Sequence, residues 1–465
     1  MKNYSLFKIR HGESIQVPTE RKKIARSFNC GIIAENCKAP KGRQKKRNNF
    51  FRPVRDSVSF GLNPAVKTAG YFRSSLRDVC LPVILAVFVA SFAYGQNDQD
   101  PIRIVRPVTF GQNPIPVSLD GFSGEVASVL KFDLYVQGFS FVSPDAAQYQ
   151  ISGSNSGNVI GHVTDKVARK EILSRSYAGA SLRREAHALS DDIVFAITGK
   201  KGIAQTKIAF KAQSENGDGE IFVSDFDGGN PQAVTHDKTI VSAPAWVPGR
   251  LALYYNSYRL GNPDIFYNNL ATGEARTIAR YGGSNISPAP SPDGSKVAMI
   301  LDKDGWVDLY VADADGSNLK RLTKSAEDES SPCWSPDGKW ICFATKIAER
   351  RVLAKIPADG GAIQVIRTTG APSPTEPDWS PDGKWIAFTR QAGEFDICVV
   401  PADGSADPVV LVAGEDPSWS PNSRTLAFTK RANYRYTLSV LDVFTKQVKD
   451  IGRISGNDSQ PSWAK

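Results

Sequence analysis

The chain has 465 residues, 41% of them hydrophobic, which is enough for two or three domains with apolar cores. Its formal net charge of +9 is unevenly placed, because residues 1–77 hold 18 Lys and Arg but only 4 Asp and Glu. The rest of the chain is net acidic, which excludes a basic surface spread over the whole protein as its means of binding.

Residues 1–78 combine the basic runs "RKKIAR" and "KGRQKKR" with Gly, Pro and Asn, and they show no apolar periodicity. This composition predicts a disordered basic leader. A nucleic-acid-binding arm is the alternative interpretation, but the segment that follows argues against it, and we expect no nucleic-acid partner. We expect translation to begin near Leu76, so that the leader is not part of the exported protein.

An export signal is predicted at residues 79–95, the apolar run "VCLPVILAVFVASFAYG" that follows two arginines. A basic flank, an apolar stretch and the small-residue ending Ala93-Tyr94-Gly95 are the parts of a secretory signal peptide. The run is shorter than the about 20 residues of a spanning helix, and no stop-transfer flank follows it. We therefore predict export with cleavage near Gly95; an uncleaved anchor is the alternative.

Three cysteines follow the predicted cleavage site, namely Cys333, Cys342 and Cys398. Their number is odd and each lies in an apolar, strand-like run, so we predict buried free thiols. The earlier pair Cys30 and Cys37 has no partners at zinc-ligand spacing, and we predict neither a metal nor a cofactor.

Residues 96–200 are expected to form a small α/β domain. The segment 102–110 is strand-like, and 123–138 and 182–199 have helical patterns. In the second helix Leu182, Ala186, Leu189, Ile193 and Ile197 are spaced for one apolar face. Gly199 is expected to end this helix.

Residues 201–465 contain a repeat. The segments "CWSPDGKWICF" and "DWSPDGKWIAF" are nearly identical, and related segments recur at Trp246, Pro290, Trp334, Trp379, Trp419 and Trp463, with spacings of 44, 44, 45, 40 and 44 residues. A period of 40 to 45 residues with short strands and Gly-containing turns indicates the blades of a β-propeller.

Each repeat predicts four antiparallel strands. A short strand ending in Trp meets the turn Pro-Asp-Gly, an alternating strand such as "KWIAFTR" follows, and two more strands complete the blade. Because the tryptophans recur in phase with the fold, we expect them to pack between neighbouring blades rather than to stack on a ligand. These residues are Trp246, Trp334, Trp379, Trp419 and Trp463.

The two ends of the repeat region predict how the ring closes. The first unit begins at Thr206 without a preceding Trp strand, and the chain supplies such a strand only at its C-terminus. The last strand is therefore expected to complete the first blade and close six blades without an open edge. The predicted fold class is α+β, a small α/β domain followed by this propeller.

No catalytic arrangement emerges from the propeller segment. Residues 237–465 contain no His and no G-x-S-x-G sequence, which excludes a Ser-His-Asp triad within it. His187, on the second predicted helix, is expected to pack or to cap. The repeated D-x-D-G at Asp225 and Asp313 resembles part of a calcium loop but lacks its bidentate Glu, so Asx turns are the favoured interpretation and calcium the alternative.

A candidate binding surface lies where each fourth strand returns to the next blade. The connecting loops should meet at one mouth of the central channel and form an acidic, polar rim suited to protein docking. The alternative is that these loops are solvated turns. The candidate partner-binding residues are Asp237, Asn285, Asp328, Glu329, Glu376, Glu415, Asp416 and Asp458.

The order of these parts resembles the TolB family over roughly residues 97–465. The most specific resemblance is "RREAHALSDDIVFAITGKKGIAQTKIAF", where the second helix leads into the first blade, together with the P-x-W-S-P-D-G repeats. Propellers of prolyl-oligopeptidase-type peptidases share the repeat motif, but no hydrolase domain follows here.

The resemblance implies a non-enzymatic, periplasmic protein of the Tol-Pal system, which serves envelope integrity and cell division. It implies a propeller that binds a Pal-like peptidoglycan-associated lipoprotein at the channel mouth, including residues 281–290. It also implies that residues 96–108 engage a TolA-like inner-membrane protein. The alternatives are a propeller hydrolase or lyase acting on envelope polymer with channel carboxylates, and a surface sensor anchored by residues 79–95.

Overall fold

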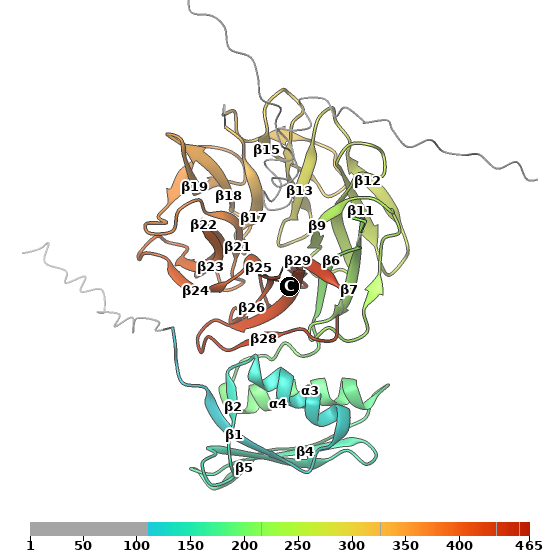
Figure 1. Cartoon of the computed structure of the whole chain (residues 1–465), viewed down its shortest axis with the longest axis vertical. Coiled ribbons are helices and arrows are strands. Elements are labelled where there is room, and N and C mark those ends of the chain that lie inside the picture. The colour runs from blue at the N-terminus through green and yellow to red at the C-terminus, as the bar shows by residue number, and fades with distance from the viewer. Residues whose placement is uncertain (1–109, 215, 326, 434, 455) are drawn as a thin grey trace, which may run out of the picture. The chain divides into compact units, whose positions relative to one another are not determined.

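The computed structural model describes residues 110–465, apart from 215, 326, 434 and 455 (Figure 1). The predicted leader, the export signal with its cleavage site near Gly95, and residues 96–108 lie outside the described residues. Within the described part, no helix is long and apolar enough to cross a membrane. The described residues belong to one compact unit, so the small domain and the propeller share it.

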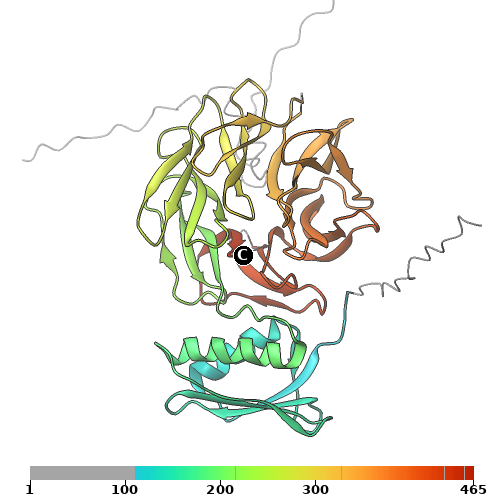
Figure 2. The same cartoon turned by 180° about the vertical axis from the view of Figure 1, so that it is seen from behind.

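The small domain is a five-stranded sheet covered on one face by two helices (Figure 2). The strand order is β2-β1-β3-β4-β5, with β1 parallel to both neighbours and the last three strands antiparallel. The elements are β1 (Ile115–Asp120), α3 (Gly124–Tyr135), β2 (Phe139–Phe141), β3 (Tyr149–Ser154), β4 (Val159–Asp165), β5 (Lys170–Tyr177) and α4 (Leu182–Thr198).

Local sequence explains the bounds of α4. The Ser181 hydroxyl accepts the Arg184 backbone N–H at 3.3 Å at its start, and Gly199 ends it in the left-handed conformation with φ 70°. Of the residues predicted for its apolar face, Ala186, Leu189 and Ile193 are buried against the sheet, whereas Leu182 is partly exposed. The helix therefore follows its predicted period except at the first turn.

The propeller consists of six four-stranded sheets around a central channel (Figure 1). Blade 1 contains β29 (Asn457–Trp463), β6 (Lys207–Gln213), β7 (Gly219–Asp225) and β8 (Gln232–Ala233). Blade 2 contains β9 (Val241–Trp246), β10 (Ala252–Ser257), β11 (Asp264–Asn269) and β12 (Ala275–Ala279). Blade 3 contains β13 (Asn285–Pro290), β14 (Lys296–Leu301), β15 (Asp308–Asp313) and β16 (Lys320–Arg321).

The remaining three blades repeat the same order from the channel outward. Blade 4 contains β17 (Ser330–Trp334), β18 (Trp340–Ile347), β19 (Arg350–Pro357) and β20 (Gln364–Ile366). Blade 5 contains β21 (Thr375–Trp379), β22 (Trp385–Ala392), β23 (Glu394–Pro401) and β24 (Val409–Ala413). Blade 6 contains β25 (Glu415–Trp419), β26 (Thr425–Ala432), β27 (Arg435–Asp442) and β28 (Val448–Asp450).

The predicted ring closure is confirmed. The C-terminal strand β29 pairs antiparallel with β6, with Asn457 opposite Gln213 and Trp463 opposite Ile208. The inner strand of blade 1 therefore comes from the other end of the propeller sequence. Without this pairing β6 would be an unpaired edge strand of a three-stranded first blade.

The repeated Ser-Pro-Asp-Gly sequence forms the turn between the first two strands of a blade. In blade 4 the Ser335 hydroxyl lies 2.6 Å from Asp337 Oδ1, which also accepts the Lys339 backbone N–H at 3.1 Å. Ser335 Oγ accepts the Trp340 backbone N–H at 2.9 Å, and Gly338 adopts φ 70°. Ser335, Asp337 and Gly338 thus each have a local role in the turn, and the same turn in other blades requires the same residues.

The five repeated tryptophans are all buried. The indole N–H of Trp334 donates to the Ala289 carbonyl of blade 3 at 2.8 Å, and that of Trp419 donates to the Asp378 carbonyl of blade 5 at 3.1 Å. Trp246 packs with residues of blades 1 and 2, whereas Trp379 donates within its own turn to Gly383 at 3.2 Å. Trp463 donates to the Thr206 hydroxyl at 2.8 Å.

The small domain and the propeller share one apolar cluster, which we call the junction core. Phe132, Tyr135 and Val136 at the end of α3 meet Phe226 and Trp463 of blade 1. Two further hydrogen bonds join the parts, from the Thr425 hydroxyl to the Val136 carbonyl (3.3 Å) and from Gln447 Nε2 to the Phe139 carbonyl (3.0 Å). The C-terminal strand therefore contributes both to ring closure and to this junction.

Trp463→Ala tests this double role. Trp463 is 1% exposed, so its removal is expected to lower the free energy of unfolding by about 3 to 5 kcal/mol, through lost burial and a cavity in the junction core. The measurement is urea denaturation followed by circular dichroism. The matched control is Trp306→Ala, at a half-exposed hairpin tip, for which we expect a change within about 0.5 kcal/mol. Equal losses for the two variants would contradict the assignment.

Candidate docking channel

Every inner strand of the propeller contains a bulge at the residue before its proline. The strand pairing shifts register there in all six blades. The residue before the proline adopts a φ between 50° and 56°, an unusual conformation for residues other than glycine. We call the six residues the bulge ring: Ala243, Ser287, Ser331, Glu376, Asp416 and Gln460.

The bulge ring lines the central channel. All six residues border a cavity of about 760 Å³, together with the prolines that follow them. A bulge redirects the side chain of its strand, and non-glycine residues in the left-handed region commonly mark functional or structurally enforced positions. The fold thus presents six side chains from six blades to one channel.

Side chains of neighbouring blades accept hydrogen bonds from the backbone N–H groups of the bulges. The Asn256 side chain accepts the Ser287 backbone N–H at 3.0 Å, and the Thr429 hydroxyl accepts that of Gln460 at 3.0 Å. Thr389 accepts the Asp416 backbone N–H at 3.2 Å. Because a bulge leaves its N–H without a partner in the strand ladder, these bonds hold the conformation and join adjacent blades.

The chemistry of the bulge ring is uneven. Blades 2 to 4 contribute Ala243, Ser287 and Ser331, whereas blades 5, 6 and 1 contribute Glu376, Asp416 and Gln460. One side of the bulge ring is therefore small and uncharged, and the other carries two carboxyl groups and an amide. The charged side chains of Glu329 and Arg351 also border the channel. Repetition of the fold fixes the positions, and the sequence of each blade fixes the charge.

The two ring carboxyl groups are hydrogen-bonded to each other. Glu376 Oε2 also accepts the Thr389 hydroxyl at 2.8 Å and the Asp416 backbone N–H at 3.1 Å. Burial raises the pKa of Glu376, and burial with the charges of Glu376 and Glu415 raises that of Asp416 well above its usual range. Both carboxyl groups consequently hold their protons more tightly than they would in water.

Basic side chains lie near this acidic side. Arg351 borders the channel and donates to the Ser330 hydroxyl at 3.3 Å, and its charge acts against the rise in the pKa of Glu376. Burial lowers the pKa of Lys211, while the charge of Asp416 acts in the opposite direction. The channel thus combines carboxyl groups with nearby basic side chains.

Of the eight predicted binding residues, only some border the channel in the structure. Glu329, Glu376 and Asp416 border the channel. Glu329 accepts the Ser325 hydroxyl at 2.7 Å, and burial raises its pKa to about 7. Asp328 is exposed outside the channel lining.

The other four predicted residues do not border this cavity. Asp237 pairs with Arg259 at 3.2 Å, and Asn285 is buried with its amide 3.2 Å from Asp264 Oδ1. Glu415 and Asp458 are buried in or beside the inner strands, and burial raises the pKa of Asp458 to about 6. For these four the side chain turns into the blades instead of forming the expected rim.

Sequence reasoning missed the uncharged members of the bulge ring. Ser287, Ser331 and Gln460 occupy the position of Glu376 and Asp416 in the repeat, directly before the proline. Alignment of the repeats on that proline would have identified them. These three residues are uncharged, so the acidic character of the loops gives no signal for them.

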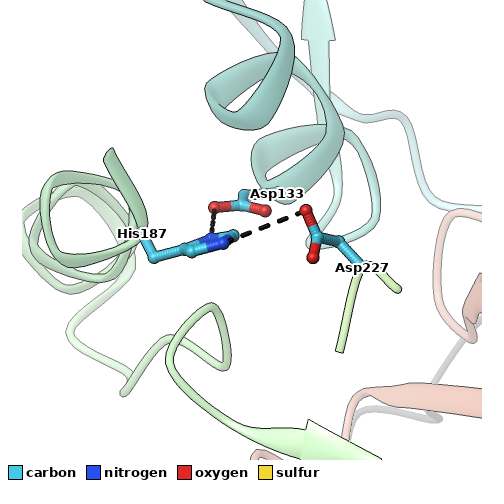
Figure 3. Close-up of side chains that lie close together, drawn as sticks. All are labelled: Asp133, His187 and Asp227. Carbon is cyan, nitrogen blue, oxygen red and sulfur yellow. Dashed lines mark hydrogen bonds and ion pairs between the residues drawn. The ribbon is translucent and has the colours of Figure 1, made fainter. Parts of the chain in front are cut away.

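Among the described residues, one group brings a histidine and two carboxyl groups close enough to hold a metal ion: Asp133, His187 and Asp227 (Figure 3). It lies apart from the channel, at the junction between the small domain and blade 1. Arg183 already forms an ion pair with Asp227, and His187 Nδ1 is hydrogen-bonded to Asp133. We therefore assign these side chains to an ion network, which we call the junction cluster.

The D-x-D-G turns are also explained without a metal ion. Asp315 Oδ1 accepts the Ser317 backbone N–H at 2.9 Å, and Asp227 Oδ1 accepts that of Gly229 at 3.1 Å. Both are Asx turns between the third and fourth strands of a blade. The second aspartate therefore closes the turn, and Asp227 additionally reaches the small domain.

These features define a closed six-bladed β-propeller that follows a small α/β domain and carries a polar channel. Residues 195–465 match the family model described as the TolB beta propeller domain. Because this match covers more than half of the chain, the chain belongs to that family. The resemblance and the fold class inferred from the sequence are both confirmed.

Individual relatives agree with the family. The chain is 33% identical over 197 residues to a protein TolB homolog of Chlorobium chlorochromatii, covering 41% of this chain and 44% of the relative. It is 31% identical over 175 residues to a Tol-Pal system protein TolB of Anaeromyxobacter dehalogenans, covering 37% of this chain and 40% of the relative. The matched segment thus spans less than half the length of these relatives.

A solved structure shows the same fold. The crystal structure of TolB from Acinetobacter baumannii superimposes with a TM-score of 0.70 at 20% sequence identity. The match covers 77% of this chain and 98% of that chain. At this identity the likeness establishes the architecture of the small domain and propeller together.

Glu415→Gln tests the electrostatics of the channel wall. Burial and the charge of Glu376 raise the pKa of Glu415 to about 7 from an ordinary value of 4.5. The folded chain therefore holds this proton more tightly than the unfolded chain, so stability is lost as pH rises through that window, by roughly 2 to 3 kcal/mol for this group. Urea denaturation at pH 4.5 and pH 8 should show a smaller loss for the variant than for the parent.

The control for that experiment is Asp328→Asn, at the exposed neighbour of Glu329. It should retain the pH dependence of the parent. Identical pH dependence in the parent and in Glu415→Gln would show that the Glu415 carboxyl group is solvated and does not belong to the buried channel wall.

Proposed function

We propose that the chain is a non-enzymatic, exported scaffold of the Tol-Pal system. In this proposal the mouth of the propeller channel binds a Pal-like peptidoglycan-associated lipoprotein, and residues 96–108 with the small domain engage a TolA-like inner-membrane protein. The protein would act in the periplasm and serve envelope integrity and cell division. The observation that carries the proposal is the uneven bulge ring in a propeller of the TolB family.

The chemistry of the channel supports binding over catalysis. The carboxyl groups of Glu376 and Asp416 are hydrogen-bonded to each other and to neighbouring blades. Glycoside hydrolysis needs two carboxyl groups about 5 Å or more apart, with the sugar linkage between them. Two carboxyl groups that bond each other and join blades 5 and 6 leave no such gap between them, so a hydrolase or lyase acting on envelope polymer is the weaker candidate.

The shape of the channel also suits a protein partner. One side offers small side chains on which apolar groups can pack, and the other offers acceptors at Glu376, Asp416 and Gln460. Charged and polar complementarity of this kind sets the orientation and specificity of protein docking. A partner that inserts a hydrogen-bond donor toward blades 5 and 6 would match both sides at once.

Ser331→Arg is the test of this proposal. Ser331 lines the small, uncharged side of the channel and its side chain has no structural hydrogen bond among those described, so the bulky substitution should obstruct docking without unfolding the blade. Titration calorimetry with the soluble domain of the cognate lipoprotein should show at least about tenfold weaker binding, a change of 1.4 kcal/mol.

The matched control is Ser317→Arg, in the turn after β15 on the outside of blade 3. It adds the same charge and bulk away from the channel and should bind as the parent does. Equal affinity of both variants would move the docking surface elsewhere. If the parent bound no lipoprotein and instead degraded envelope polymer, the enzyme alternative would replace the scaffold.

Export is tested at the mature N-terminus. The proposed cleavage near Gly95 predicts that protein recovered from the cell envelope begins at about Gln96. N-terminal peptide mapping by mass spectrometry measures this directly. Recovery of peptides from residues 1–70 in the mature protein would contradict both the cleavage site and the expected start near Leu76.

A further inference from the structure

The junction cluster joins three segments that are distant in the sequence. His187 lies on α4, Asp133 on α3, and Asp227 in the turn between β7 and β8 of blade 1 (Figure 3). His187 Nδ1 lies 2.7 Å from Asp133 Oδ2, and Nε2 lies 3.9 Å from Asp227 Oδ2. All three side chains are almost completely buried. The imidazole therefore stands between a carboxyl group of the small domain and one of the propeller.

The charges around His187 are distributed over every element that packs against it. On its own helix, Arg183 pairs with Asp227 and Asp191 lies nearby; on α3, Asp133 bonds the ring directly. The last residue of β7 contributes Asp225 and the turn after it Asp227. The segment after β28 contributes Arg453, whose Nε lies 3.9 Å from Asp227 Oδ2. Glu125 on α3 pairs with both Arg183 (3.3 Å) and Arg453 (3.2 Å).

Three atoms of the cluster have no hydrogen-bond partner: Asp133 Oδ1, His187 Nε2 and Asp227 Oδ2. A neutral ring has a single N–H and can donate to only one of the two carboxyl groups. A protonated ring carries an N–H on both nitrogens, one bonded to Asp133 and the other 3.9 Å from Asp227 Oδ2. Burial of two carboxylates thus favours the imidazolium form.

The proton affinity of the pair follows from this arrangement. Burial alone would lower the pKa of His187, but the hydrogen bond to Asp133 and the charges of Asp133 and Asp227 outweigh it and raise the pKa above its ordinary 6.5. Burial raises the pKa of Asp133 to about 7, against the effect of its bond to His187. The Asp133 and His187 pair therefore keeps its proton to a higher pH than the two groups would separately.

We propose that the junction cluster is a proton-dependent fastening between the small domain and the propeller. The protonated ring ties α3 and α4 to blade 1, and loss of its proton removes the positive charge between Asp133 and Asp227 and leaves the Arg183–Asp227 ion pair as the remaining link from α4 to the blade. The junction is then expected to open more readily, while the blades remote from it stay closed. This inference concerns the mobility of the small domain and does not depend on which partner the channel binds.

Proton linkage determines the direction in which pH changes the opening of the junction. The closed junction binds one more proton than the open one once the pH exceeds the 6.5 of a free imidazole, so opening releases that proton. The stabilisation is complete below this pH and is lost as pH rises through the higher value of the closed state. Release of one proton changes the opening equilibrium about tenfold per pH unit within that window.

Two measurements on the full-length protein test the proposal. The chain has only four histidines, so selective ¹⁵N labelling of histidine rings allows the His187 ring to be followed by NMR as pH is varied, with assignment from His187→Gln. Hydrogen exchange between pH 6.5 and 8.5, corrected for the intrinsic rate, then reports opening. Exchange at Leu189 and Ile193 on α4 should accelerate as the pH rises, by up to about tenfold per pH unit within that window, and at Met299 and Ile300 on β14 it should hardly change.

Substitutions distinguish the effect of the His187 proton from the effect of side-chain packing at the junction. His187→Gln keeps a donor toward Asp133 without a titrating charge, so its α4 exchange should be fast at both pH values. If this variant does not fold, Asp227→Asn tests the propeller side, and it should reduce the pH dependence. The matched control is His236→Gln, an exposed histidine of the propeller, which should behave as the parent does.

Three outcomes would overturn the proposal. The His187 ring could remain neutral throughout pH 5 to 9, or it could be protonated while exchange at α4 is independent of pH. The third is that the purified protein contains one metal ion per chain and that its removal by EDTA raises α4 exchange equally at both pH values. In that case the three unpartnered atoms would hold a cation in place of a proton.

Discussion

Pairing of the last strand, β29, with the first propeller strand, β6, is the contact on which the rest of the structure depends. It closes the ring and removes the exposed edges that an open array of blades would have. It also brings Gln460 into the bulge ring and Trp463 into the junction core, where the end of α3 packs. One strand from the C-terminus therefore completes both the candidate docking channel and the connection to the small domain.

The channel combines a repeated backbone with varied side chains. In each blade the residue before the proline is turned toward the channel by a bulge, and neighbouring blades supply acceptors such as Asn256, Thr389 and Thr429 for the displaced backbone. The bulges fix the positions of six residues at the channel but not their residue types. Two of the six, Glu376 and Asp416, are acidic and lie in adjacent blades. The same residues that join the blades thus also determine what the channel can bind.

The sequence predicted the parts of the fold that have a local or periodic cause. The Ser-Pro-Asp-Gly turns, the six units, the closing strand and the end of α4 at Gly199 each follow from spacing or backbone chemistry. The sheet of the small domain was less accessible, because its short strands alternate weakly and pair out of chain order, with β1 between β2 and β3. At the channel, the loop residues selected from the sequence include Glu329, which borders the cavity, and Asn285, whose buried amide instead bonds Asp264.

The sequence by itself determined the repeat, the number of blades, the turn chemistry and the family, because these depend on residues close together in the chain or in phase with one another. Only the tertiary structure decided which polar residues meet. Asp133, His187 and Asp227 are far apart in the sequence and carry no shared motif, yet they converge where the end of α3, α4 and the first blade pack. Such a cluster arises from the packing of distant segments, and burial then gives its side chains proton affinities that they would not have in the unfolded chain.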